Sequence, residues 1–230
     1  MLSFLRLFFI VIWTAFSITL SLIFSLLFFN RDITMKMARG FWAPGMLFIA
    51  NCKLYVEGLK NIPLNEPIIF ISNHKSYFDV ACLIKAIPIN IHFIAKKTLS
   101  KIPFLAWYMY AAKAIFIDRS NPRNAMQSLD RAGRLIKEGR SVLVFPEGTR
   151  SNTGNLLKFK KGAFVLAKKA NVKIIPVYIK GTDKVWTSNN TLKNGNVKIT
   201  FGEAIENIGE MELNQSIELM KGKLESLRDK

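Results

Sequence analysis

The stretch Pro67-Ile-Ile-Phe-Ile-Ser-Asn-His-Lys-Ser-Tyr-Phe-Asp79 joins a short apolar run to a polar loop and then to a helical pattern. Residues 67–72 are rich in isoleucine and phenylalanine, which predicts a buried strand. Residues 77–87 have the pattern of a helix, and Pro88 ends it. A strand that leads directly into a helix is typical of layered α/β folds.

Similar units recur along the chain on both sides of this stretch. We expect further strands at residues 53–57, 91–95, 114–118, 141–145, 172–179 and 197–201. We expect helices after Pro103, along an apolar stripe from Met126 to Ile136, at residues 157–169, and from Leu213 to Leu227. The pattern predicts an α/β fold with a mostly parallel central sheet flanked by helices.

The N-terminal part of the chain has a different pattern. Residues 7–29 contain no charge, and as a helix they would rise about 35 Å, enough to cross a hydrocarbon core of about 30 Å. Residues 41–50 are apolar but too short to cross, and we expect an interfacial or re-entrant helix that pairs with the first. The alternative for both segments is a buried core helix. We therefore divide the chain into N-terminal membrane-anchoring helices, residues 1–51, and a folded body, residues 52–230.

The charges around this segment predict its orientation. No small-residue cleavage site follows the apolar run, so a cleaved signal peptide is rejected. Arg6 precedes the run, whereas Arg31, Lys36 and Arg39 follow it. If the segment spans a membrane, this bias places the body on the cytoplasmic side.

The composition favours an anionic partner. The 230 residues include 33 Lys+Arg and 16 Asp+Glu, which gives a net charge of +17. Such a charge suits nucleic acid, anionic lipid headgroups, or phosphorylated and acidic substrates. We find no nucleic-acid-binding motif and expect no nucleic-acid partner. Cys52 and Cys82 show no metal-ligand spacing, and we expect no metal site.

His74 and Asp79 form the most informative pair. His74 follows a predicted strand, at the edge of the sheet where α/β folds bind ligands. On one continuous helix, residues five apart point about 140° away from each other, so the pair can meet only if the chain bends at Ser76. A carboxylate on Nδ1–H would then leave Nε2 free to deprotonate a hydroxyl. The alternative is structural: Asp79 could cap the helix and His74 could be an ordinary loop residue. His92 alternates with apolar residues and is interpreted as structural.

A second polar turn, Phe145-Pro-Glu-Gly-Thr-Arg-Ser151, also follows a predicted strand. Gly148 permits close approach of the backbone, and Arg150 can hold a phosphate with two parallel hydrogen bonds. Glu147 could orient Arg150 or a substrate hydroxyl. The alternative is a simple turn between a strand and a helix.

Base or cation side chains stand at the ends of several predicted strands. These residues are His74, Lys96, Arg119 and Arg150. Because parallel strands end at the same edge of a sheet, we expect the four residues to converge there.

With these residues in view, the chain resembles the glycerolipid acyltransferase family, specifically the bacterial 1-acyl-sn-glycerol-3-phosphate acyltransferases. The resemblance covers roughly residues 50–205. It rests on four blocks in order, Asn73-His74 with Asp79, Ile115-Phe-Ile-Asp-Arg119, Phe145-Pro-Glu-Gly-Thr-Arg150 and Ile175-Pro-Val177. Lys113 and Thr98 depart from the family's usual residues, which puts the acceptor in question.

The resemblance implies roles for particular residues. His74 would be the general base and Asp79 the residue that orients it. Phosphate and acceptor contacts would come from the first three of these blocks and from Lys96, at the end of a predicted strand. The residues are Asn73, Lys96, Phe116, Asp118, Arg119, Glu147, Gly148, Thr149 and Arg150. The family also implies that the N-terminal helices can dip into one leaflet.

The implied reaction moves an acyl chain from acyl-CoA or acyl-carrier protein to the sn-2 hydroxyl of lysophosphatidic acid. The product is phosphatidic acid, and no cofactor is needed beyond the acyl donor. The implied location is the cytoplasmic face of the cell's inner membrane. Two alternatives stay open: the same chemistry on another lysophospholipid or on an aminoacyl lipid, and a non-catalytic, membrane-tethered binder of anionic lipid.

Overall fold

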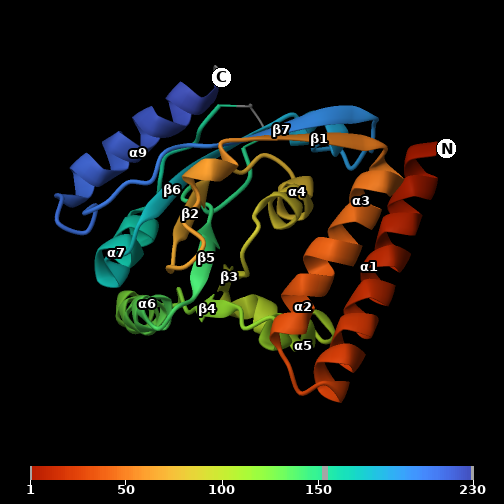
Figure 1. The fold of residues 1–230 in the computed structure, drawn as a ribbon, viewed down its shortest axis with the longest axis horizontal. Coiled ribbons are helices and arrows are strands. Elements are labelled where there is room, and N and C mark those ends of the chain that lie inside the picture. The colour runs from red at the N-terminus through yellow and green to blue at the C-terminus, as the bar shows by residue number, and fades with distance from the viewer. Residues whose placement is uncertain (1, 152–154, 229–230) are drawn as a thin grey trace.

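A seven-stranded sheet forms the centre of the molecule in a computed structural model that describes residues 2–151 and 155–228 (Figure 1). The strand order is β1-β7-β6-β2-β5-β3-β4. The strands are β1 Cys52–Glu57, β2 Ile69–Ser72, β3 Ile91–Lys96, β4 Ile115–Ile117, β5 Ser141–Val144, β6 Ile174–Lys180 and β7 Gly195–Phe201. All seven expected strands are therefore present, with ends shifted by a few residues.

The sheet is parallel at every pairing except one. Strands β6 and β7 run antiparallel, from Val177 opposite Phe201 to Lys180 opposite Lys198. Because β2, β5, β3 and β4 are mutually parallel, their C-terminal ends lie at one edge. The mostly parallel sheet predicted from the sequence is thus confirmed. Every residue of β2 and β5 is buried, as expected for strands covered on both faces.

Helices cover both faces of the sheet (Figure 1). One hydrophobic cluster joins the sheet to α1, α3 and α4, and a second joins it to α6, α7 and α9. The helices are α1 Leu2–Leu27, α2 Asp32–Met37, α3 Ala43–Ala50, α4 Phe78–Ala86, α5 Leu105–Ala111, α6 Pro122–Lys137, α7 Lys161–Ala170, α8 Thr182–Val185 and α9 Leu213–Arg228. A π-helical turn, η1 (Ala38–Trp42), precedes α3, and 3-10 turns occupy η2 (Leu59–Asn61) and η3 (Lys97–Lys101).

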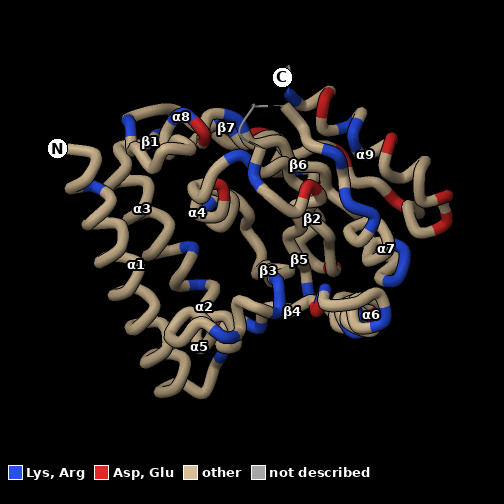
Figure 2. Tube along the Cα trace, turned by 180° about the vertical axis from the view of Figure 1, so that it is seen from behind, with Lys and Arg blue, Asp and Glu red and all other residues tan. Residues whose placement is uncertain are grey.

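Helix α1 is long and apolar enough to cross a membrane, and only 17% of its most apolar stretch is buried. Its buried positions include three serines spaced four residues apart, Ser17, Ser21 and Ser25. Its phenylalanines and the leucines near its two ends are instead exposed, and Phe29, just beyond its end, is 91% exposed. In Figure 2 the helix is almost free of charged residues. This reversed pattern indicates that α1 associates with a membrane.

The pairing expected between residues 41–50 and the first segment is present. The indole Nε1 of Trp13 donates a hydrogen bond to the carbonyl oxygen of Trp42 at 2.9 Å. At Gly45, a Cβ atom would lie 2.1 Å from the Trp13 ring, so only glycine permits this approach of α3 to α1. The same helices share one hydrophobic cluster with the sheet.

One expected helix begins later than predicted. Residues 157–169 were expected to be helical, but α7 starts at Lys161. The backbone before it is held extended, since the N–H of Leu157 donates to the Glu147 carboxylate at 2.9 Å and the N–H of Lys160 donates to the carbonyl of Pro146 at 2.8 Å. These long-range contacts override the local helical pattern.

Candidate active site

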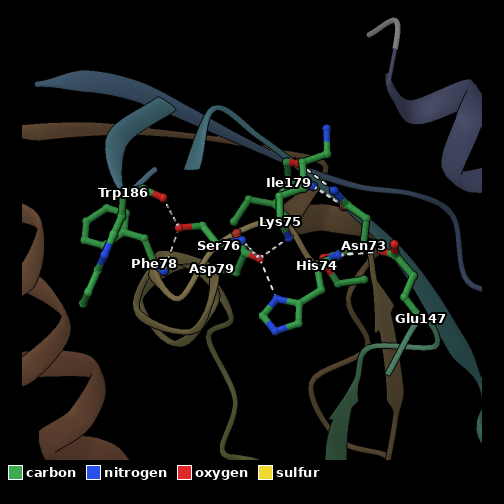
Figure 3. A network of polar contacts seen from close by, with 10 residues as sticks. Asn73, His74, Lys75, Ser76, Phe78, Asp79, Glu147, Ile179 and Trp186 are labelled. Carbon is green, nitrogen blue, oxygen red and sulfur yellow. Dashed lines mark hydrogen bonds and ion pairs between the residues drawn. The ribbon is translucent and has the colours of Figure 1, made fainter. Parts of the chain in front are cut away.

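His74 and Asp79 meet at the C-terminal end of β2 (Figure 3). His74 Nδ1 and Asp79 Oδ2 are 2.7 Å apart. Asp79 is fully buried in the first turn of α4, and the His74 side chain is 17% exposed. Among the described residues, none hydrogen bonds with Nε2 of His74. The bend expected at Ser76 is therefore present, and it leaves one ring nitrogen accessible.

The Asp79 carboxylate also organises the loop that carries His74. Its Oδ2 atom accepts the backbone N–H of Lys75 at 2.7 Å and that of Ser76 at 2.9 Å. Ser76 lies one residue before the N-cap, and its hydroxyl oxygen accepts the N–H of Phe78. One carboxylate therefore fixes both the loop and the imidazole, so the structural contacts of Asp79 do not exclude its contact with His74.

The loop that carries His74 and the turn that carries Glu147 are hydrogen-bonded to each other at the same place. The N–H of Ser151 donates to the carbonyl of His74 at 2.8 Å, and the N–H of His74 donates to Glu147 Oε1 at 2.9 Å. The ring of Phe145 stacks on the imidazole, with centroids 4.0 Å apart and planes 16° apart. The backbone contacts thus hold the main chain of His74, and the Phe145 ring packs against a face of the imidazole.

Glu147 has different partners from those that we expected. Its carboxylate accepts the N–H of His74 and that of Leu157, and the residue is 2% exposed (Figure 3). We expected it to orient Arg150 or a substrate hydroxyl, but both oxygens are used by the backbone. Burial raises the pKa of Glu147, and the two backbone hydrogen bonds oppose that rise. Glu147 therefore positions the two loops.

Asn73 also serves the scaffold. Its side chain is fully buried and pairs with the backbone of Ile179 in β6, donating to the carbonyl at 2.9 Å and accepting the N–H at 2.8 Å. The sequence placed Asn73 among the substrate-binding residues. Because both polar atoms of its amide are engaged by Ile179, the side chain instead joins the end of β2 to β6.

Arg150 lies beside the start of α4. Its guanidinium carbon is 3.4 Å from the centroid of the Tyr77 ring, which is half-exposed. Thr149 and Gly148 are exposed. Gly148 has φ +69°, a left-handed conformation that favours glycine in this turn. Tyr77 and Lys160 were not expected from the sequence, since their positions depend on contacts between separate loops.

A pocket of about 250 Å³ opens between the turn after β5 and the end of β4. Arg119, Phe145, Gly148 and Lys160 contribute to its wall. Phe145 also stacks on His74, so one side chain links the pocket to the imidazole. Of the four residues expected to converge, Arg119 is the one found among the described wall residues of this pocket, and Gly148 represents the turn that contains Arg150.

Phe116 and Asp118 do not share this pocket. Side chains alternate along β4, so Ile117 and Arg119 face one side and Phe116 and Asp118 face the other. Asp118 pairs with Lys97 at 2.8 Å, and that hydrogen bond lowers the pKa of Asp118 to about 2. These two expected substrate-binding residues thus line a separate cavity. Lys96 ends β3 and is exposed.

The other histidine of the chain, His92, has a contact with the backbone of the scaffold. His92 is buried and its Nδ1 lies 3.1 Å from the carbonyl oxygen of Ala112, which fits the structural interpretation. Burial lowers the pKa of His92. Within residues 2–151 and 155–228, no group of three or more His, Cys, Asp or Glu side chains is placed to hold a metal ion.

Comparisons with known proteins point to one family. The family model described as acyltransferase matches residues 53–180. A chloroplastic 1-acyl-sn-glycerol-3-phosphate acyltransferase from Arabidopsis thaliana is 37% identical over 156 residues, which cover 66% of this chain and 44% of the relative. The beta form from Homo sapiens is 30% identical over 182 residues, covering 78% of this chain and 66% of that protein. The chain spans less than half the length of the first curated relatives that it matches.

A solved structure matches the whole fold. The 1-acyl-sn-glycerophosphate acyltransferase PlsC from Thermotoga maritima superposes with a TM-score of 0.82 at 28% identity. The match covers 100% of this chain and 95% of the other. The family model alone spans more than half of the 230 residues, and it includes the loops of both His74 and Arg150. The chain therefore belongs to the acyltransferase family, as its motifs predicted.

Proposed function

We propose that the protein transfers an acyl chain from an acyl thioester to the sn-2 hydroxyl of 1-acyl-sn-glycerol-3-phosphate, giving phosphatidic acid. The observation that carries this proposal is the 2.7 Å contact between His74 Nδ1 and Asp79 Oδ2, which leaves Nε2 available. An imidazole held in this way is a general base for an alcohol. The names of the relatives supply the acceptor.

The proposed reaction needs one base and one direct transfer. An ionised carboxylate only accepts hydrogen bonds, so the contact with Asp79 fixes the proton on Nδ1 of His74. Nε2 takes the proton of the acceptor hydroxyl as its oxygen attacks the thioester carbonyl. The tetrahedral intermediate then expels the thiolate, and the imidazolium returns the proton to that sulfur. The Asp79 carboxylate stabilises the imidazolium while it exists.

The acceptor phosphate binds on the side of the turn that contains Thr149 and Arg150. Arg150 offers a planar guanidinium, Thr149 an exposed hydroxyl, and Arg119 a second cation across the 250 Å³ pocket. Tyr77 supports the Arg150 guanidinium from its ring face. Glu147 and Asn73 act as positioning residues, because their polar atoms hold backbone groups of the two loops.

The proposed location follows from the apolar surface of α1. Residues 1–51 attach the protein to the cytoplasmic face of the cell's inner membrane, and residues 52–230 carry the catalysis. This arrangement suits a lipid acceptor and a lipid product. The donor is acyl-CoA or acyl-carrier protein, and the proposed reaction needs no metal or redox cofactor.

Two other functions remain as alternatives. The departures at Thr98 and Lys113 favour the same chemistry on another lysophospholipid or on an aminoacyl lipid. A non-catalytic binder of anionic lipid would account for the net charge of +17 but leaves the His74–Asp79 contact without a purpose.

A substrate panel tests the proposal. The purified full-length protein is incubated with acyl-CoA or acyl-carrier protein and with a set of lysolipids that includes lysophosphatidic acid. We expect phosphatidic acid as the main product. Turnover of another lysolipid with lysophosphatidic acid ignored would overturn the acceptor assignment. If no acyl chain is transferred to any acceptor from either donor, the assignment of the protein as an enzyme is overturned.

A further inference from the structure

A second cavity, of about 340 Å³, lies where β6, β7, α8 and the end of α9 come together. We name it the basic cavity, because five of its wall residues are cations and, among the described residues that line it, one is acidic. These six residues are Lys75, Lys180, Lys184, Lys198, Arg228 and Asp183. Figure 2 shows basic residues on α8, on β7 and near the end of α9.

The charge of this cavity favours an anion with several negative groups. Lys198 pairs with Glu57 at 2.8 Å, and Lys75 Nζ donates to the hydroxyl of Tyr178 at 3.2 Å. Asp183 and Glu57 together do not balance five cations, so a positive potential remains in a concave space. Charge-assisted hydrogen bonds to phosphate oxygens would offset the mutual repulsion of these side chains.

The basic cavity is connected to the catalytic loop through Lys75. The backbone N–H of Lys75 donates to Asp79 Oδ2, while its side chain reaches Tyr178 in the cavity wall. Lys75 is adjacent to His74, so their Cα atoms are about 3.8 Å apart. A ligand held in the cavity can therefore contact the residue that follows His74 in the chain, without occupying the pocket lined by Arg119.

The cavity opens partly on the face of the sheet that carries α9. Tyr178, in its wall, belongs to the hydrophobic cluster of α7 and α9, whereas Val197, also in its wall, belongs to the cluster of α1 and α3 on the other face. Figure 1 shows α1 and α9 on opposite sides of the molecule. A ligand that arrives from water can reach this face, whereas a lipid acceptor approaches from the side of α1.

We propose that the basic cavity binds the phosphate groups of the nucleotide end of an acyl-CoA donor, so that the thioester reaches His74 beside Lys75. This inference rests on the proposed function. A concave, polycationic space suits the compact phosphates of a nucleotide. The acceptor already has its own cations, Arg119 and Arg150, and it carries a single phosphate.

The test compares two donors that differ in the nucleotide that carries these phosphates. Lys180 and Lys184 are exposed residues of the cavity wall, and the double variant Lys180→Gln/Lys184→Gln removes two charges. Initial rates are measured with acyl-CoA, with acyl-carrier protein, and with the matching acyl-pantetheine, which keeps the thioester and lacks the nucleotide. The double variant Lys221→Gln/Lys223→Gln, on the exposed surface of α9, is the control with an equal change of charge.

We expect the KM for acyl-CoA to rise at least about ten-fold in the cavity variant. Its kcat, its KM for the acceptor and its rate with acyl-pantetheine should match wild type, and the control should match wild type with both donors. Arg228→Gln, at the end of α9, is a second variant that should show the same difference between donors.

Three results would overturn the inference. They are an unchanged KM for acyl-CoA, an equal loss with both donors, and a loss confined to acyl-carrier protein, which would assign the cavity to a protein donor. If wild type transfers from no thioester, the proposed function fails as well, so the two failures are distinguishable.

Discussion

Replacing Asp79 with asparagine removes a negative charge from the site with little change of shape. In the structure Asp79 Oδ2 accepts hydrogen bonds from His74 Nδ1 and from the backbone N–H groups of Lys75 and Ser76. Among the described residues, Oδ1 is buried without a hydrogen-bond partner. An asparagine can therefore place its oxygen at the Oδ2 position and its NH2 at the Oδ1 position. The hydrogen bonds persist and the charge is lost.

The size of the effect follows from Coulomb's law. The charge centres of the carboxylate and of the imidazolium that forms during transfer are roughly 4 Å apart, which at an effective dielectric constant of about 20 gives about 4 kcal/mol. Since about 1.4 kcal/mol corresponds to a factor of ten, kcat should fall by about 10³ in Asp79→Asn. The KM for either substrate should change little, because the charge acts on the transition state.

The assay measures kcat at saturating donor and acceptor, with thermal unfolding as a control for the fold. Asp79→Ala serves for comparison, because it also removes the acceptor for the Lys75 and Ser76 N–H groups and should destabilise the loop as well. An Asp79→Asn variant that is folded and retains kcat within about ten-fold of wild type would refute the electrostatic role assigned to Asp79.

Three further variants test the positioning residues. Asn73→Ala leaves both backbone groups of Ile179 without partners, so the free energy of unfolding should fall by about 2 kcal/mol or more. The acceptor KM of the folded enzyme should stay unchanged. A raised acceptor KM with normal stability would instead show that Asn73 binds the substrate. Tyr77→Ala removes the ring under Arg150 and should raise the acceptor KM about two- to five-fold, whereas Tyr77→Phe should match wild type; equal KM values in both variants would contradict a supporting role. For Glu147, burial raises the folded-state pKa, so the folded protein holds this proton more tightly than the unfolded chain and its stability falls as pH rises from about 4.5 through the raised pKa. The Tm of wild type minus that of Glu147→Gln should therefore decrease across this window, and an increase would show that the sign is wrong.

Local sequence patterns predicted the sheet well. The apolar runs at β2 and β5 were recognised because strands buried on both faces have an unbroken hydrophobic pattern. The meeting of His74 and Asp79 was also predictable, because the polar loop before α4 permits the bend that a helix forbids. Features that depend on residues close in sequence were therefore correctly anticipated.

Features that depend on contacts between residues distant in sequence were not anticipated. Asn73 pairs with Ile179, 106 residues away, and no local pattern indicates that its amide is used inside the scaffold. Glu147 is held by His74 and Leu157 from two separate loops. The separation of Phe116 from Arg119 follows from strand alternation, which the sequence contains, but the opposing walls become visible only in the folded chain.

The proton-accepting role of His74 has a direct test in the His74→Ala variant. Its turnover is measured with acyl-CoA and lysophosphatidic acid, and its binding to vesicles of anionic phospholipid is measured in parallel. The account predicts that turnover falls by several orders of magnitude while vesicle binding, which depends on α1 and the basic surface, equals that of wild type. Turnover equal to wild type would contradict the account.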